Sequence, residues 1–113
     1  MARSSAARAL KASAPVFAAL GDETRLYLVA RLCDDGPLSI ARLAEGAGVT
    51  RQAVTKHLRV LAGAGLVDSR HEGRETVWSL ELKRISDARR MLETISREWD
   101  DTLDRLRAFV ESD

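Results

Sequence analysis

The segment from residue 38 to residue 81 changes its hydrophobic period from helical to alternating, and this change limits the folds open to the chain. Ser39 is a favoured N-cap residue and predicts the start of a short helix, after which residues 46–49 form a glycine-containing turn. Thr50 is placed to cap a second helix, whose apolar face repeats at helical spacing through Val54, Leu58 and Leu61. The first part of the segment therefore predicts two helices joined by a tight turn.

Two short segments with β-branched and aromatic residues follow and predict a β-hairpin. They run from Leu66 to Arg70 and from Glu75 to Leu80, and Gly73 lies in the turn between them. A helix, a turn, a second helix with a basic face and a hairpin, in this order, are typical of a winged helix-turn-helix. The predicted fold class is mainly α with a small β-hairpin, in the order α-α-α-α-β-β-α.

Helical segments are predicted on both sides of this unit. Pro15 lies in the first turn of a helix that Gly21 ends, and Asp22 caps the next helix, which stops at residues 34–37. From about residue 82 to residue 110 the chain has no Gly or Pro. Its apolar residues keep a heptad spacing there: Ile85, Ala88, Leu92, Ile95, Trp99, Thr102, Leu106 and Phe109.

The domain organisation follows from these elements. Residues 1–13 are predicted to form a flexible basic N-terminal arm, because their Ala, Ser and Arg residues show no clear period. Residues 14–113 are predicted to form one winged helix-turn-helix domain with a C-terminal dimerisation helix at about 82–110. A chain of 113 residues has room for one such domain.

The distribution of charge says more about partners than the net charge of +1. Residues 50–65 contain three basic side chains and no acidic one, and a local basic face suits contact with phosphates. No apolar run approaches the ~20 residues that span a bilayer, so no membrane partner is expected. The single cysteine, Cys33, fits a reducing cytoplasm and is expected to be a small buried side chain; a redox role for it stays a lesser alternative.

The second helix of the unit is the candidate for reading DNA, because the major groove admits a helix with one apolar and one polar face. Arg51 suits guanine and Gln52 suits adenine, and Arg74 at the hairpin tip suits a phosphate or a narrow minor groove. His57 is interpreted as a partly buried, hydrogen-bonded residue or a phosphate contact. The DNA-binding residues predicted are Ser39, Thr50, Arg51, Gln52, Thr55, Lys56, His57, Arg59 and Arg74.

A homodimer is predicted, because the seam of the last helix would be exposed on a lone small domain. Two-fold symmetry predicts a pseudo-palindromic operator with half-sites about one helical turn apart. The predicted interface residues are Phe17, Leu92, Ile95, Trp99, Leu106 and Phe109.

Three separate motifs resemble the ArsR-type family of bacterial repressors. They are the segment from Phe17 to Leu26, the segment from Ala53 to Leu61 with Ala64 to Val67, and Gly73 to Trp78 in the hairpin. The resemblance covers roughly residues 15–110. It implies a winged-helix dimer that binds an operator and represses transcription, with the first and last helices at the dimer interface.

The resemblance also limits the cofactors. Metal-sensing members of the family carry paired cysteines before the recognition helix, where this chain has Ser39 and Ala41. Other members carry Asp and His ligands on the last helix, and residues 82–113 contain no His. Soft and borderline metals need thiolate or imidazole ligands, so neither a metal nor another cofactor is predicted. The effector that releases the DNA stays open.

One alternative class competes with a DNA-binding regulator. Winged helices also serve as protein-docking folds, and in that case the acidic-leaning last helix would bind another protein. An enzyme is not predicted, since no nucleophile–base pattern and no phosphate-binding glycine loop is found. Asp100, Asp101 and Asp104 are interpreted as partners in surface ion pairs.

Overall fold

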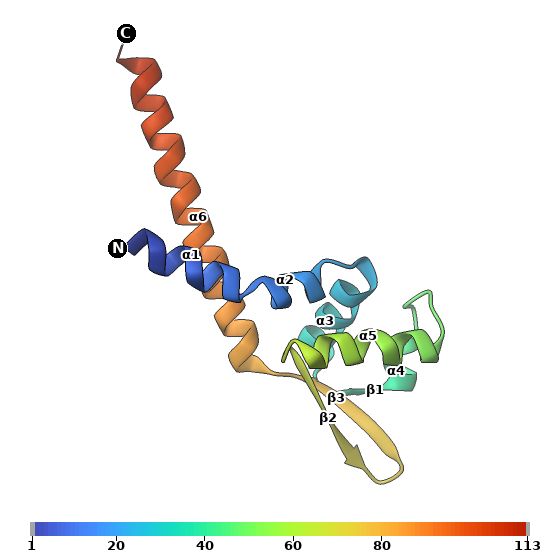
Figure 1. Cartoon of the computed structure of the whole chain (residues 1–113). Helices are drawn as coiled ribbons and strands as arrows, with labels where there is room; N and C mark the ends of the chain where they lie inside the picture. The colour runs from blue at the N-terminus through green and yellow to red at the C-terminus, as the bar shows by residue number, and fades with distance from the viewer. Residues whose placement is uncertain (1, 113) are drawn as a thin grey trace.

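The computed structural model describes residues 2–112. These residues form six helices and three strands around one core (Figure 1). The elements are α1 (Ala2–Ala12), α2 (Ala14–Leu20), α3 (Glu23–Asp35), β1 (Leu38–Ser39), α4 (Ile40–Ala44), α5 (Arg51–Gly63), β2 (Val67–Glu72), β3 (Glu75–Leu80) and α6 (Leu82–Glu111).

The starts of three helices are fixed by the side chains that the sequence predicts as N-caps. Asp22 accepts a hydrogen bond from the backbone N–H of Arg25, and Ser39 accepts one from Arg42. Thr50 accepts one from Ala53 across 3.1 Å. Each side chain satisfies an N–H group that has no partner within its own helix, which confirms these three predicted helix starts.

The hairpin is confirmed, and a third strand joins it. Strands β2 and β3 pair antiparallel with Glu72 opposite Glu75, so only Gly73 and Arg74 form the turn. Gly73 has a φ of 63°, which suits the first central position of a type II′ turn. The sheet order is β1-β3-β2, and β1 is not among the predicted strands, because two residues are too few to show an alternating pattern.

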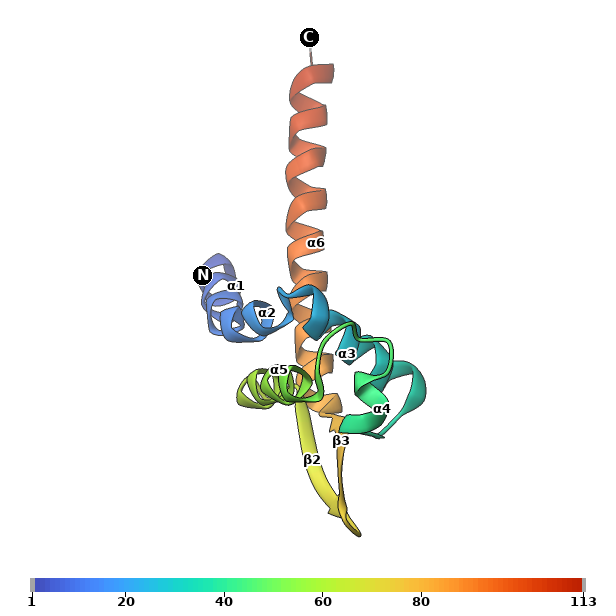
Figure 2. The same cartoon turned by 90° about the vertical axis from the view of Figure 1, so that its right-hand side faces the viewer.

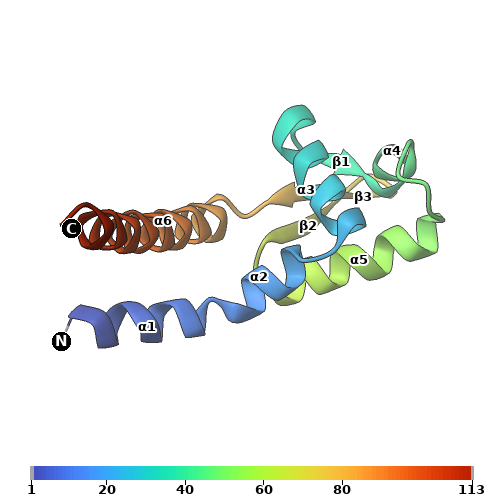
Figure 3. The ribbon, with the colours of Figure 1, turned by 90° about the horizontal axis from the view of Figure 1, so that it is seen from above.

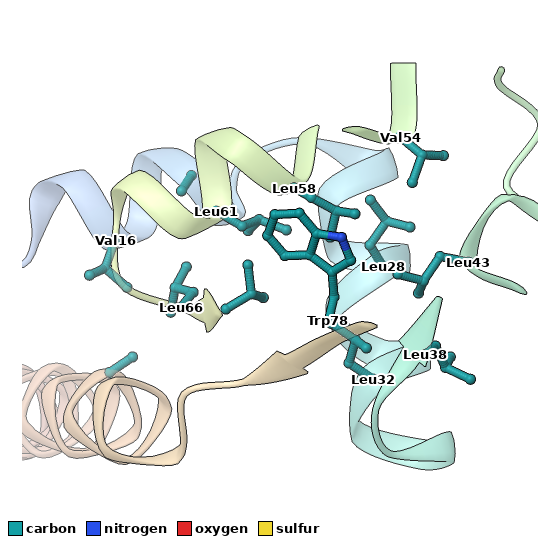
Figure 4. Close-up of a cluster of buried hydrophobic side chains, with 13 residues drawn as sticks. Val16, Leu28, Leu32, Leu38, Leu43, Val54, Leu58, Leu61, Leu66 and Trp78 are labelled. Atoms are coloured by element: carbon teal, nitrogen blue, oxygen red, sulfur yellow. The ribbon is translucent and has the colours of Figure 1, made fainter. Parts of the chain in front are cut away.

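The core lies between α5, α3 and the sheet (Figure 4). Val54, Leu58 and Leu61 of α5 are fully buried, as their spacing predicts. Trp78 of β3 packs among them, and Leu28 of α3 and Leu43 of α4 close the cluster. This packing holds α5 on the domain by one face and leaves its other face to solvent.

The C-terminal helix leaves this body and projects from it (Figure 1). Only Ala88 of α6 is buried, and the molecule measures 68 × 28 × 20 Å. Its radius of gyration is 18.4 Å, against about 13 Å for a compact chain of this length. Figure 2 shows α6 and the β2–β3 hairpin extending from opposite ends of the body. Within residues 2–112, no helix combines the length and apolarity needed to cross a membrane.

Besides the added strand β1, the structure differs from the sequence expectations at the N-terminal segment and at Cys33. Residues 2–12 of the predicted arm form helix α1, which contacts α6; Met1 lies outside the described residues. Cys33 is exposed rather than buried, because the inward-facing positions near the end of α3 are occupied by Val29 and Leu32. The predicted order therefore lacked α1 and β1, while the mainly helical fold with its hairpin is confirmed.

Candidate nucleic-acid interface

Helix α5 presents a basic face opposite its buried face. At 100° per residue, Gln52, Lys56 and Arg59 lie on the side away from the core, and Arg51 lies at the first turn. All four side chains are exposed. Figure 3 shows α5 lying along the edge of the body.

The basic side chains of this face are free of acidic partners. Among the described residues, Arg51, Lys56 and Arg59 form no ion pair, whereas Arg89 and Arg90 of α6 are paired with Glu93 and Asp87. An unpaired surface cation keeps its charge available for a phosphate or a base edge. The charge of the face is therefore not cancelled locally.

Three of the predicted contact residues also stabilise the backbone. Ser39 and Thr50 cap α4 and α5 with their hydroxyl oxygens. Thr55 is half-buried, and its hydroxyl donates to the carbonyl of Arg51 across 2.9 Å. The hydroxyl proton of Thr55 is thus used within the helix, which leaves its methyl group and its oxygen lone pairs for an outside partner.

His57 lies on the flank of α5 that meets the junction between α2 and α3. The guanidinium of Arg25 contacts Nδ1 of His57 at 3.3 Å, and the carboxylate of Asp22 lies 3.8 Å from the same nitrogen. The partly buried interpretation of His57 is confirmed, and its partner is a side chain rather than the backbone. The ring is held in place by α3, with Nδ1 directed toward the protein.

Arg25 is a structural residue that sequence reasoning missed. Besides His57, its guanidinium donates to the carbonyls of Ala18 and Ala19 at the end of α2. These carbonyls lie in the last turn of α2, where that of Ala18 also accepts from the N–H of Gly21, and Arg25 thus joins α2, α3 and α5. The only signal in the sequence was a basic residue three positions after the Asp22 cap, and nothing there indicated a partner at position 57.

The carboxylate of Asp22 is ionised more readily than a free aspartate. The hydrogen bond from the backbone N–H of Arg25 holds the pKa of Asp22 below its ordinary value of 3.8, against the opposing effect of partial burial. The charges of the Arg25 guanidinium and of His57 lower the pKa of Asp22 further.

The turn between α4 and α5 is tied to α3. The hydroxyl of Tyr27 donates to the carbonyl of Glu45 across 3.2 Å, and Arg31 donates to the same carbonyl across 3.1 Å. Gly46 follows with a φ of 75° and passes so close to Tyr27 that a Cβ there would lie 2.9 Å from the hydroxyl. The beginning of this turn is therefore held against α3.

The hairpin tip carries one unpaired cation. Arg74 is exposed in the two-residue turn and has no acidic partner among the described residues, whereas Arg70 is paired with Glu72 at 2.7 Å. His71 is exposed as well, on strand β2 opposite Thr76. Of the basic residues in the wing, Arg74 is the one available for a backbone phosphate.

The predicted dimer residues lie on two helices. On α6, Trp99 is 63% exposed and Phe109 is 77% exposed, and Leu92 and Leu106 are exposed as well. Ile95 of α6 and Phe17 of α2 are half-buried. An apolar seam of this size at the surface of a lone chain is unusual for a folded domain.

Metal ligands do not gather in the part of the chain that the structure describes. No three His, Cys, Asp or Glu side chains lie close enough there to hold an ion. The absence of a metal cofactor stays a prediction.

Comparison with known proteins identifies the family. Residues 20–70 match the family model described as a helix-turn-helix domain. The HTH-type transcriptional regulator Rv2034 of Mycobacterium tuberculosis is 36% identical over 95 residues, which are 84% of this chain and 85% of that protein. The ArsR-like transcriptional regulator from Rhodococcus sp. RHA1 superposes with a TM-score of 0.69 at 38% identity, over 85% of this chain and 90% of that one. The chain belongs to the ArsR-like family of transcriptional regulators.

Membership of the ArsR-like family confirms the resemblance seen in the sequence. The chain is a transcriptional regulator with a winged helix-turn-helix DNA-binding domain. The fold alone is also shared with Mb0332 from Mycobacterium bovis, described as a homodimeric winged helix-turn-helix DNA-binding domain, at a TM-score of 0.62 and 24% identity. In the ArsR-like fold α5 is the second helix of the helix-turn-helix, and β2 and β3 form the wing.

Proposed function

We propose that this regulator binds a pseudo-palindromic operator as a homodimer and represses transcription. Each protomer places the exposed face of α5 in the major groove of one half-site, and Arg74 of the wing contacts the flanking backbone. The observation that carries the proposal is the row of unpaired cations on the one face of α5 that the core leaves free. Repression is proposed from the family resemblance.

The roles of the α5 residues follow from their positions. Residues in the first turn of a recognition helix approach base edges first, so Arg51 and Gln52 are assigned to bases. Lys56 lies one turn further along the same face and contacts a base or a phosphate, and Arg59 contacts a phosphate. His57 contacts a phosphate through Nε2, because Nδ1 is directed to Arg25.

The two capping residues act through the backbone, and the half-buried Thr55 acts through its methyl group. Ser39 and Thr50 cap the N-termini of α4 and α5, where the free N–H groups of a helix can bind a DNA phosphate. The methyl group of Thr55 suits the methyl group of a thymine. No metal, other cofactor or catalytic step is assigned to the chain.

A homodimer is proposed because the seam of α6 lies open on the single chain. Burying it against a second copy removes Trp99, Leu106 and Phe109 from water, and each large side chain contributes on the order of 1.5–3 kcal/mol when fully buried. The two-fold axis then presents two copies of α5 to one side of the DNA. The proposed interface consists of Phe17, Leu92, Ile95, Trp99, Leu106 and Phe109.

Selection of bound duplexes from a random library tests this function without knowledge of the operator. The proposal predicts an inverted repeat whose half-sites are centred about 10 base pairs, or a multiple of that spacing, apart. The selected duplex should be bound at least ~10³-fold more tightly than a scrambled one at a stated salt concentration.

Two results would contradict the proposal. Enrichment of a single half-site by a monomer would overturn the dimeric mode of binding. A pool without any enriched sequence would leave only non-specific electrostatic binding and would favour the protein-docking alternative.

A further inference from the structure

We infer that His57 makes operator binding pH-dependent, because its ring exchanges Arg25 for Asp22 as a partner when it is protonated and then presents a positive charge to a DNA phosphate. The affinity for the operator should therefore rise as the pH falls through the range in which histidine ordinarily titrates. This inference rests on the proposed function and adds its regulation.

One nitrogen of the His57 ring faces both a hydrogen-bond donor and an acceptor. The guanidinium of Arg25 lies 3.3 Å from Nδ1, and the carboxylate of Asp22 lies 3.8 Å from the same nitrogen. A neutral ring with an unprotonated Nδ1 accepts from Arg25, whereas a protonated ring has a hydrogen on Nδ1 and can only donate. The two protonation states of His57 therefore use different partners, and both partners are already in place.

The exchange leaves the other contacts of these partners intact. The Asp22 oxygen nearest to His57 is the one that caps α3 by accepting from the N–H of Arg25, and a carboxylate oxygen can accept a second hydrogen bond. Arg25 stays anchored without His57, since Nε and Nη2 donate to the carbonyls of Ala19 and Ala18. Protonation thus replaces one contact of α5 with another, and α5 remains attached to the start of α3.

Asp22 and Arg25 are the ionisable groups that face His57. The elements that pack against α5 are α2, α3, α4 and β2, and α2 contains no ionisable side chain. Within residues 2–112, the remaining ionisable groups of α3, α4 and β2 form no hydrogen bond or ion pair with His57. On α5 itself, the nearest charged residues are the exposed cations Lys56 and Arg59. A DNA phosphate beside these cations supplies the negative charge that favours a protonated His57.

A protonated His57 strengthens the contact with DNA. The side chain is 24% exposed, and Nε2 is the ring nitrogen that faces neither Asp22 nor Arg25. The cluster of His57, Asp22 and Arg25 changes from no net charge to a net positive charge when the ring gains a proton. A hydrogen bond from a charged donor is about twice as strong as one from a neutral donor, which corresponds to about a fivefold gain in affinity.

NMR of the ring nitrogens tests the exchange of partners in the protein without DNA. His71→Gln leaves His57 as the single histidine of the chain, so the ring signals belong to it. At pH 8 we expect Nδ1 to be unprotonated and the ring hydrogen to lie on Nε2, and at pH 5 both nitrogens should carry hydrogen. A hydrogen on Nδ1 at pH 8, or a ring that stays neutral at pH 5, would overturn the inference.

Fluorescence anisotropy on the selected duplex tests the regulation of binding. Between pH 8 and pH 5.5 at constant salt, the wild type should gain about fivefold in affinity. His57→Gln keeps an acceptor for Arg25 but cannot gain a proton, so its affinity should stay constant. His71→Gln is the matched control, because His71 is the other histidine, and it should keep the full response. In the wild type, the slope of log affinity against log salt should be steeper by about 0.9 at pH 5.5 than at pH 8, since one more phosphate is neutralised.

The two histidine variants separate the possible results. A response that persists in His57→Gln, or one that is lost in His71→Gln, would overturn the inference, as would equal affinities of the wild type at both pH values. Asp22→Asn should reduce the response, and a full response in this variant would show that Asp22 is not the partner of the protonated ring. Absence of any selected duplex would instead contradict the proposed function.

Discussion

Arg25 donates a hydrogen bond to Nδ1 of His57 across 3.3 Å, and this bond joins the first turn of α3 to the middle of α5. A guanidinium has only donors, so this contact is a hydrogen bond in the tautomer whose Nδ1 carries no proton. The recognition helix is thus contacted by a side chain 32 positions earlier in the chain.

Coupling between these two residues is the first prediction. His57→Ala should lower the free energy of unfolding by about 1 kcal/mol, and Arg25→Ala by more, because Arg25 also serves the end of α2. The double variant should lose less than the sum of the two single losses, by about 0.5–1.5 kcal/mol. Urea unfolding of the four proteins measures this, and strict additivity would contradict the contact.

Asp22 gives a prediction on acid stability. Its folded-state pKa is lowered below 3.8, chiefly by the N–H of Arg25, so the ionised carboxylate stabilises the fold above that value. This contribution is lost as the pH falls through the lowered pKa, because the unfolded state binds the proton more readily there.

Asp22→Asn keeps an acceptor for the cap but removes the charge, and it isolates this effect. At constant ionic strength, the melting temperature of the wild type should exceed that of the variant at pH 6. This difference in melting temperature should shrink below pH 3.8. A difference that does not change with pH would show that the charge of Asp22 does not contribute.

The third prediction concerns Gly46 in the turn before α5, with Gly48 of the same turn as its control. Gly46 and Gly48 both have a φ near 75°, but only at Gly46 would an added Cβ meet the hydroxyl of Tyr27. Both Ala substitutions should lower the free energy of unfolding by about 1–2 kcal/mol because of the left-handed backbone, and Gly46→Ala should lower it further. The additional loss at Gly46 should be smaller in a protein that also carries Tyr27→Phe. Equal losses in urea unfolding at the two positions would contradict the close approach.

The fold was largely predictable because its signals are local. The caps Asp22, Ser39 and Thr50 and the apolar spacing of Val54 and Leu58 each act within one or two turns of helix, so they could be read from neighbouring residues. The family motifs then fixed the order of the main elements. Membership of the family could be predicted for the same reason.

The features that were missed depend on distant partners or on short segments. β1 is two residues long and exists only because Leu38 pairs with Trp78 of β3. Helix α1 has no clear apolar period of its own, and it lies against α6, which is distant in the sequence. The contacts of Arg25 and Tyr27 with α5 and its turn leave no local pattern, since either residue at these positions could face solvent. The DNA contacts themselves stay predictions.

The most direct test of the central claim is DNA binding by charge-reversed α5. Arg51→Glu with Lys56→Glu changes two exposed residues without ion pairs in the described chain, so the fold should be retained. Arg107→Glu on α6 changes an exposed cation far from α5 and serves as the control. Fluorescence anisotropy on the selected duplex should show the α5 variant losing at least ~10³-fold in affinity, to the level of non-specific binding, with the control close to wild type. Wild-type affinity in the folded α5 variant would contradict the assignment of α5 as the DNA-reading helix.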